Sequence, residues 1–130
     1  MSREAIGHRL FTIMRHDPDR AEVERVHSNM PAVYPVGGRK RKQDTAWSDH
    51  VLGAMQAYRA NDAAGIRAAF DDHETILGLG LASVLNVPVV SEGRCIGTMN
   101  LLHEAGWYRP EDEAAGRRIA AYLIPALLPR

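Results

Sequence analysis

Two apolar segments near the C-terminal end constrain the fold more than any other feature. Residues 83–91 (SVLNVPVVS) and 94–102 (RCIGTMNLL) are strand-like and are joined by Glu92-Gly93. Glycine adopts positive φ at little cost, so this junction predicts a tight β-hairpin turn. Both segments are apolar on both faces, which predicts a hairpin covered on both sides in the middle of a sheet. Pro88 lacks an N–H, so its position should face an unpaired side or a bulge.

A second hairpin is predicted nearer the N-terminus. Residues 8–15 and 21–27 are short extended runs on either side of the turn 17–19 (DPD). Residues 29–43 contain two prolines and a Gly-Gly pair and are expected to form a loop.

Helical patterns fill the middle and the end of the chain. Residues 45–58 predict a helix from the helical spacing of Trp47, Val51, Met55 and Tyr58, and 58–61 predict a short strand. Asp62 and then Asp71 or Asp72 can cap two short helices. Pro110 should begin the last helix. Its expected buried stripe is Ala115, Ile119, Tyr122, Leu123 and Ala126. This order predicts one α+β domain over residues 1–130 with a central antiparallel sheet.

Composition excludes several classes of protein. The 130 residues carry 16 basic and 16 acidic side chains, and a neutral chain lacks the positive field of a non-specific nucleic-acid binder. The chain has no apolar run of about 18–20 residues and no signal-like leader, so neither a membrane span nor secretion is expected. The lone Cys95 cannot form an internal disulfide, which favours a reducing, cytoplasmic location.

Charge is nevertheless unevenly distributed. Residues 1–42 hold nine basic and five acidic side chains (+4), mostly because of the run 39–42 (RKRK). This run is either a solvated segment or an anion-binding lid over a pocket, and four charges are too few to predict nucleic-acid binding.

The closing half of the chain resembles a GAF domain. Residues 84–103 (VLNVPVVSEGRCIGTMNLLH) contain a strand with Val-Pro-aliphatic, a glycine turn and a strand with aliphatic-Gly-x-aliphatic. A glycine-aromatic loop and Pro-Glu-Asp follow in residues 106–113 (GWYRPEDE), and the resemblance covers residues 72–128.

This resemblance implies a profilin-like antiparallel sheet of about six strands. Helices would cover one face, and loops and short helices would roof a pocket on the other. GAF domains typically bind small molecules and commonly form homodimers through their terminal helices. No cofactor is implied for this chain.

Three departures from the family pattern matter. Only residues 1–7 are available for the family's leading helix, which should be short or missing. Arg109 stands where a capping Ser or Thr is common, and a guanidinium cannot accept a hydrogen bond. One branch of the family reduces free methionine sulfoxide, but this chain has only Cys95, and Asn100 stands where that branch is acidic. We therefore do not expect that activity.

Three candidate ligand contacts lie in the region that would roof the pocket. His73 could donate to a ligand or titrate, or it could be an exposed residue at a helix start. Trp47 could stack on a ligand and donate its N–H, or pack in the core. Tyr34 could be a pocket wall or part of a plain loop.

Two asparagines in the apolar strands are the other candidates. A buried amide must be paired, and either a ligand or a neighbouring group could pair with Asn100 or Asn86. A simple two-residue hairpin would place the two on opposite faces, so at most one is expected to serve unless a bulge intervenes.

Metal and nucleophile patterns are missing from the sequence. The six histidines (His8, His16, His27, His50, His73 and His103) show no metal-ligand spacing, so no metal site is expected.

Our first hypothesis is a non-catalytic, dimeric domain that binds a polar or anionic metabolite. The alternatives are a small enzyme using His73 as general acid or base, and a structural or regulatory subunit with a vestigial pocket.

Overall fold

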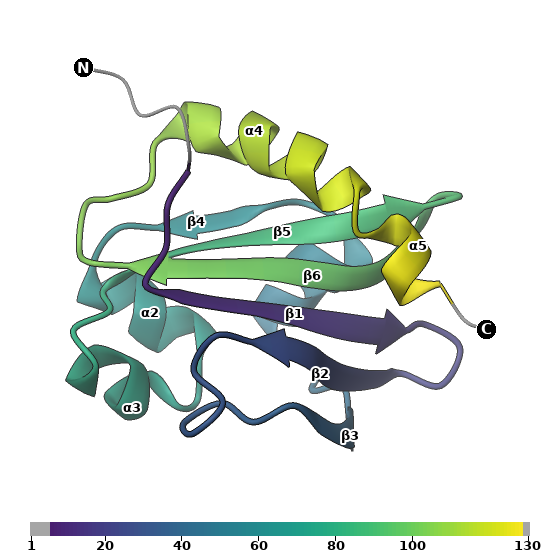
Figure 1. The fold of residues 1–130 in the computed structure, drawn as a ribbon, viewed down its shortest axis with the longest axis horizontal. Helices are drawn as coiled ribbons and strands as arrows, with labels where there is room; N and C mark the ends of the chain where they lie inside the picture. The colour runs from purple at the N-terminus through teal and green to yellow at the C-terminus, as the bar shows by residue number, and fades with distance from the viewer. Residues whose placement is uncertain (1–5, 129–130) are drawn as a thin grey trace.

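A computed structural model describes residues 6–128 as a six-stranded antiparallel sheet with helices on both sides (Figure 1). The strand order is β3-β2-β1-β6-β5-β4. The strands are β1 (Leu10–Asp17), β2 (Glu22–Ser28), β3 (Gly37–Arg41), β4 (Tyr58–Ala60), β5 (Ser83–Ser91) and β6 (Arg94–His103). The predicted α+β class and both predicted hairpins are confirmed. No helix among these described residues is long and apolar enough to cross a membrane.

The hairpin β5–β6 lies in the interior of the sheet, as predicted. Both turn residues have positive φ, 53° at Glu92 and 76° at Gly93, as a two-residue type I′ turn requires. Beyond Asn86, none of the described residues forms a strand beside β5 on its β4 side, so the missing N–H of Pro88 interrupts no ladder there.

A β-bulge in this hairpin corrects the expected placement of the two asparagines. The pairing register shifts between Val89 and Val90, so that Asn86 lies directly opposite Asn100. One extra residue in one strand moves every later side chain to the other face. The two asparagines therefore share a face instead of lying on opposite faces.

One face of the sheet is covered by α4 (Pro110–Ala121) and α5 (Ile124–Leu127). The predicted buried stripe of the last helix is wrong in three positions, because Ile119 is 47% exposed, Tyr122 is 86% exposed and Ala126 is exposed as well. Gly116 and Ala120 are buried instead. A helix that turns glycine and alanine toward a strand can approach it closely, and Gly116 lies against Val87 of β5.

The opposite face carries a layer of short helices that we call the roof. It consists of α1 (Ala46–Ser48), the π-helix η1 (Asp49–Gly53), α2 (Ala63–Ala69) and α3 (His73–Gly78). The helix predicted over 45–58 is thus too long. Helical structure ends at Gly53, and Met55 has a left-handed φ of 56°. The chain must reverse there because residues 58–60 hydrogen-bond to β5 as a strand.

The expected loop over 29–43 is also corrected. Residues 37–41 form the edge strand β3, paired with β2, and all five are exposed. Gly37 and Gly38 begin this strand with positive φ. The basic run therefore lies along a sheet edge, where charged side chains discourage pairing with other chains.

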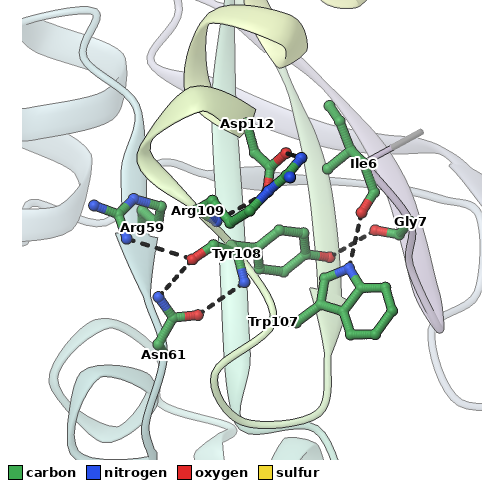
Figure 2. A network of polar contacts seen from close by, with 8 residues as sticks. All are labelled: Ile6, Gly7, Arg59, Asn61, Trp107, Tyr108, Arg109 and Asp112. Carbon is green, nitrogen blue, oxygen red and sulfur yellow. Dashed lines mark hydrogen bonds and ion pairs between the residues drawn. The ribbon is translucent and has the colours of Figure 1, made fainter. Parts of the chain in front are cut away.

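Polar contacts hold the segment before α4 against the N-terminal segment and against the residue that follows β4 (Figure 2). The Asn61 side chain donates to the Tyr108 carbonyl at 2.8 Å and accepts from its N–H at 2.9 Å. The Trp107 indole N–H donates to the Ile6 carbonyl at 2.8 Å, and the Tyr108 hydroxyl donates to the Gly7 carbonyl at 3.0 Å. The start of α4 is thus tied to the N-terminal segment and to the residue after β4.

The N-terminus of α4 is capped from inside the helix. The Arg109 side chain accepts no hydrogen bond, as expected, but its backbone N–H donates to the Asp112 carboxylate at 2.8 Å. The Arg109 guanidinium also pairs with Asp112 at 3.0 Å (Figure 2). The leading-helix expectation for 1–7 falls mostly outside the described residues, and Ile6 and Gly7 are not helical.

Candidate functional site

A chain of side-chain hydrogen bonds crosses the roof face of the sheet. The Trp47 indole N–H donates to Asn86 Oδ1 at 2.9 Å, and Asn86 Nδ2 donates to Asn100 Oδ1 at 2.8 Å. Asn100 Nδ2 in turn donates to Thr12 Oγ1 at 3.2 Å. These four residues, which we call the amide chain, connect α1 to three neighbouring strands.

Local sequence positions the Trp47 end of the amide chain, and hydrogen bonding satisfies the buried asparagines. Thr45 caps α1 and forms a reciprocal capping box with Ser48, which orients the turn that carries Trp47. Asn86 is buried, and a buried amide is costly unless it is hydrogen-bonded. Here the neighbouring side chains supply these bonds. The two asparagines therefore do not require a ligand to be satisfied.

A small groove lies beside Trp47 in the roof. Its volume is about 260 Å³, and it is lined by Ala46, Trp47, His50, Tyr58, Ala68 and Ala69. Its aromatic wall is braced, because the Tyr58 hydroxyl donates to the Gly65 carbonyl at 2.7 Å. The bond from Trp47 to Asn86 closes the space directly between Trp47 and the sheet, so a ligand of the asparagines would have to replace that bond.

Tyr34 and His73 form a separate group near the start of α3. The Tyr34 hydroxyl donates to Asp72 Oδ2 at 2.7 Å, and the Arg25 guanidinium lies 5.0 Å from the centre of the Tyr34 ring. Burial, and then the Asp72 carboxylate, raise the pKa of Tyr34. His73 Nδ1 is buried with no partner among residues 6–128. Of the five predicted site residues, the structure therefore groups Trp47 with Asn86 and Asn100, and Tyr34 with the neighbourhood of His73.

Sequence reasoning overlooked two buried polar side chains on the roof face. Thr98 is fully buried and its hydroxyl has no partner among the described residues. His16 Nδ1 lies 2.7 Å from the Cys95 carbonyl oxygen, while its Nε2 is buried and likewise lacks a described partner. A threonine inside an apolar strand was a usable signal for Thr98. No local sequence signal pointed to His16, because its burial depends on packing against the strands β2 and β6.

A larger hollow lies elsewhere in the described structure. Its volume is about 690 Å³, between the two hairpin turns and α5, and it contains none of the predicted site residues. Its arginines are already paired, since Arg94 contacts Asp19 at 2.7 Å and Arg15 contacts Glu24 at 3.4 Å. A ligand there would have to displace these carboxylates.

Comparison with known proteins assigns nearly all of the chain to a single family. The model of the family described as GAF domain matches residues 3–127. No curated protein matches the sequence.

Several solved structures share the fold at low sequence identity. The GAF domain of a phosphoenolpyruvate-protein phosphotransferase from Coxiella burnetii is 17% identical, with a TM-score of 0.75 over 94% of this chain and 73% of that chain. A GAF domain/HD domain protein from Geobacter sulfurreducens is 15% identical, with a TM-score of 0.72 over 92% and 80% of the two chains. A type II free methionine-R-sulfoxide reductase from Thermoplasma acidophilum is 16% identical, with a TM-score of 0.65 over 92% and 79%. At these identities the likeness concerns the fold alone.

Proposed function

Because the chain belongs to the GAF domain family, we propose that it is a sensory domain that binds a small polar or anionic metabolite on its roof face. GAF domains are in general small-molecule-binding sensory domains. We assign the binding site to Trp47, Asn86 and Asn100.

The amide chain is the single observation that carries this proposal. It concentrates amide donors and acceptors on the roof face, and Trp47 separates them from a groove that is open to solvent. A metabolite with polar groups can take over the bond from Trp47 to Asn86, so that no buried amide is left unpaired. An apolar ligand would leave Asn86 unpaired and would therefore bind poorly.

We assign no catalytic activity to this site. Free methionine sulfoxide reduction needs a reactive thiolate and a resolving thiol. Cys95 is the lone cysteine of the sequence, it is 3% exposed, and burial raises the pKa of its thiol. A buried thiol held neutral is a poor nucleophile. A reducing, cytoplasmic setting stays a prediction from the same lone cysteine.

We also propose that the domain forms a homodimer through its C-terminal helices. Ile119 of α4 and Tyr122, the residue that follows α4, are large hydrophobic side chains. Ile119 is about half exposed and Tyr122 is mostly exposed. Leu128, just after α5, is 41% exposed. A second copy packed on this face would remove these side chains from water.

Ligand binding can be tested with purified protein and a panel of polar and anionic metabolites. A ligand of the native state should raise the melting temperature by an amount that grows with the logarithm of its concentration relative to Kd. Trp47→Phe, which deletes the donor to Asn86, should change the size of this shift in melting temperature. Trp107→Phe, on the α4 face, should leave the shift unchanged. If millimolar metabolites leave the melting temperature unchanged, or if both variants lose the response equally, the proposal fails.

Dimerisation can be tested by light scattering coupled to gel filtration. Tyr122→Glu should convert a dimer into a monomer. The matched control is Val36→Glu, which places the same charge at an apolar side chain that is 56% exposed, away from α4. A monomeric wild-type protein would refute this part of the proposal.

A further inference from the structure

We propose that the roof face contains a concealed polar subsite, formed by His16 and Thr98 beneath η1, that receives the hydroxyl group of a small hydroxylated anion. The inference deepens the proposed function and rests on it, since it names the class of ligand for the same face.

His16 and Thr98 are neighbours across two paired strands. Thr98 of β6 pairs directly with Met14 of β1, and His16 is two residues further along β1 on the same face. Such diagonal neighbours lie about 7–8 Å apart at their backbones, which leaves room for one bridging group between two side-chain tips. Both side chains are more than nine-tenths buried, Thr98 at 0% and His16 at 7% exposure.

The hydrogen bond at Nδ1 decides which proton His16 carries. The Cys95 carbonyl oxygen, 2.7 Å away, can only accept, so Nδ1 holds the hydrogen. Burial lowers the pKa of His16, and the positive charge of Lys42 lowers it further. The ring is therefore neutral near pH 7, and Nε2 presents a lone pair that needs a donor.

A hydroxyl group complements both unpaired atoms. It can donate to His16 Nε2 and accept from the Thr98 hydroxyl at the same time. An ether or a carboxylate oxygen could only accept and would leave Nε2 unpaired. An ammonium group could donate, but of the three charges that act on His16, the cations Lys42 and Arg94 outnumber the Asp17 carboxylate and disfavour a second cation.

Lys42 supplies the attraction for an anion. Its ammonium group pairs with Asp44 at 2.9 Å, and that carboxylate is 90% exposed. An ion pair with so exposed a partner is weak, so a ligand carboxylate or phosphate can replace Asp44. A hydroxyl at the His16–Thr98 subsite and an anionic group at Lys42 together define the ligand.

His16 also lines the hollow of about 690 Å³ between the two hairpin turns and α5, and η1 covers the subsite from the roof side. Val51 and Leu52 of η1 are buried against Cys95, next to His16, and η1 packs on β5 and β6. Met55, two residues beyond η1, holds a left-handed φ of 56° that is strained for a side chain of its size. Relief of this strain at the residue beyond η1 favours a rearrangement of the segment that covers the subsite.

The unliganded protein offers a first test with a matched pair of variants. Thr98→Val removes an unpaired hydroxyl and should raise the melting temperature by about 2–5 °C. Thr12→Val on the adjacent strand removes a hydroxyl that accepts from Asn100 and should lower it. If Thr98→Val lowers the melting temperature as much as Thr12→Val does, the hydroxyl is already paired, for example by an internal water, and the inference is overturned.

A second test uses three small probes that separate charge from hydroxyl. Lactate carries both, propionate carries the charge alone, and 1,2-propanediol carries hydroxyls without the charge. Calorimetry should show lactate binding at least about tenfold more tightly than the other two, and Thr98→Val should remove the advantage over propionate. Glycerol 3-phosphate, run in parallel, reports whether a phosphate serves better than a carboxylate.

The outcomes distinguish this inference from the proposed function. If lactate and glycerol 3-phosphate fail to bind while another polar metabolite does, or if binding depends on Trp47 but not on Thr98, the subsite is refuted and the proposed function stands. If no metabolite binds at all, both fail.

Discussion

Replacing Trp47 by phenylalanine tests the amide chain most directly. The substitution keeps an aromatic ring against the roof but deletes the N–H that donates to Asn86 Oδ1 at 2.9 Å. Among the described residues Trp47 supplies the side-chain bond to that oxygen, and Asn86 is only 2% exposed. The variant therefore leaves the buried Asn86 Oδ1 without this donor.

The expected loss follows from the cost of such an unpaired group. Leaving a buried acceptor without its donor costs about 1–3 kcal/mol. For a chain of 130 residues, an unfolding entropy of about 2 cal/mol/K per residue makes each kcal/mol worth about 4 °C of melting temperature. Trp47→Phe should thus melt about 4–11 °C below the wild type in a circular-dichroism scan.

A double-mutant cycle separates the hydrogen bond from ring packing. Asn86→Leu breaks the same bond from the other side, so the combined variant should be more stable than the sum of the two single losses predicts, by about 1 kcal/mol or more. Additive losses, or a Trp47→Phe variant within about 0.5 kcal/mol of the wild type, would show that the bond contributes nothing and would refute the reasoning.

Two further predictions concern the packing of α4 and the titration of His16. A Cβ at Gly116 would lie 2.9 Å from Val87 Cγ2, which is too close for van der Waals contact. Alanine also favours the helix more than glycine does, so the net loss in the free energy of unfolding of Gly116→Ala, measured by urea denaturation, should be up to about 2 kcal/mol. Gly78→Ala, with nothing within 4 Å, should instead gain about 0.4–1 kcal/mol, and equal stability of the two variants would contradict the close packing. Because the folded-state pKa of His16 is lowered, its contribution to stability is fully present above about pH 6.5 and declines as the pH falls below that value. Denaturation midpoints measured from pH 7.5 downward should therefore fall more steeply in the wild type than in His16→Gln, and parallel curves would count against a buried neutral ring.

Features of the fold that depend on residues adjacent in the sequence could be predicted from the sequence. The apolar run 83–91 and Glu92-Gly93 are sufficient to indicate the central hairpin, because turn geometry and side-chain alternation are local properties. Asp62 caps α2 as expected, through a bond from the Gly65 N–H at 2.9 Å. Pro110 begins α4 for the same kind of local reason.

The candidate site depended on contacts that no local pattern encodes. A single bulge at Val89–Val90 placed Asn86 beside Asn100 and joined them to Trp47. Pairing of residues 58–60 with β5 requires the helical stretch to end after η1, which shortens the predicted helix. Strand register and burial are set by residues far apart in the chain, so spacing alone could not decide them.

By itself, the sequence determined the two hairpins and the starts of α2 and α4, since each follows from the preferences of a few adjacent residues, whereas the edge strand β3 was not predicted. Only the tertiary structure decided which polar side chains meet and which are left unpaired. Thr12 and Thr98 have the same side chain on neighbouring strands, yet the hydroxyl of Thr12 is hydrogen-bonded while that of Thr98 has no described partner. The difference arises because hydrogen bonding inside a core depends on what the fold packs opposite each group.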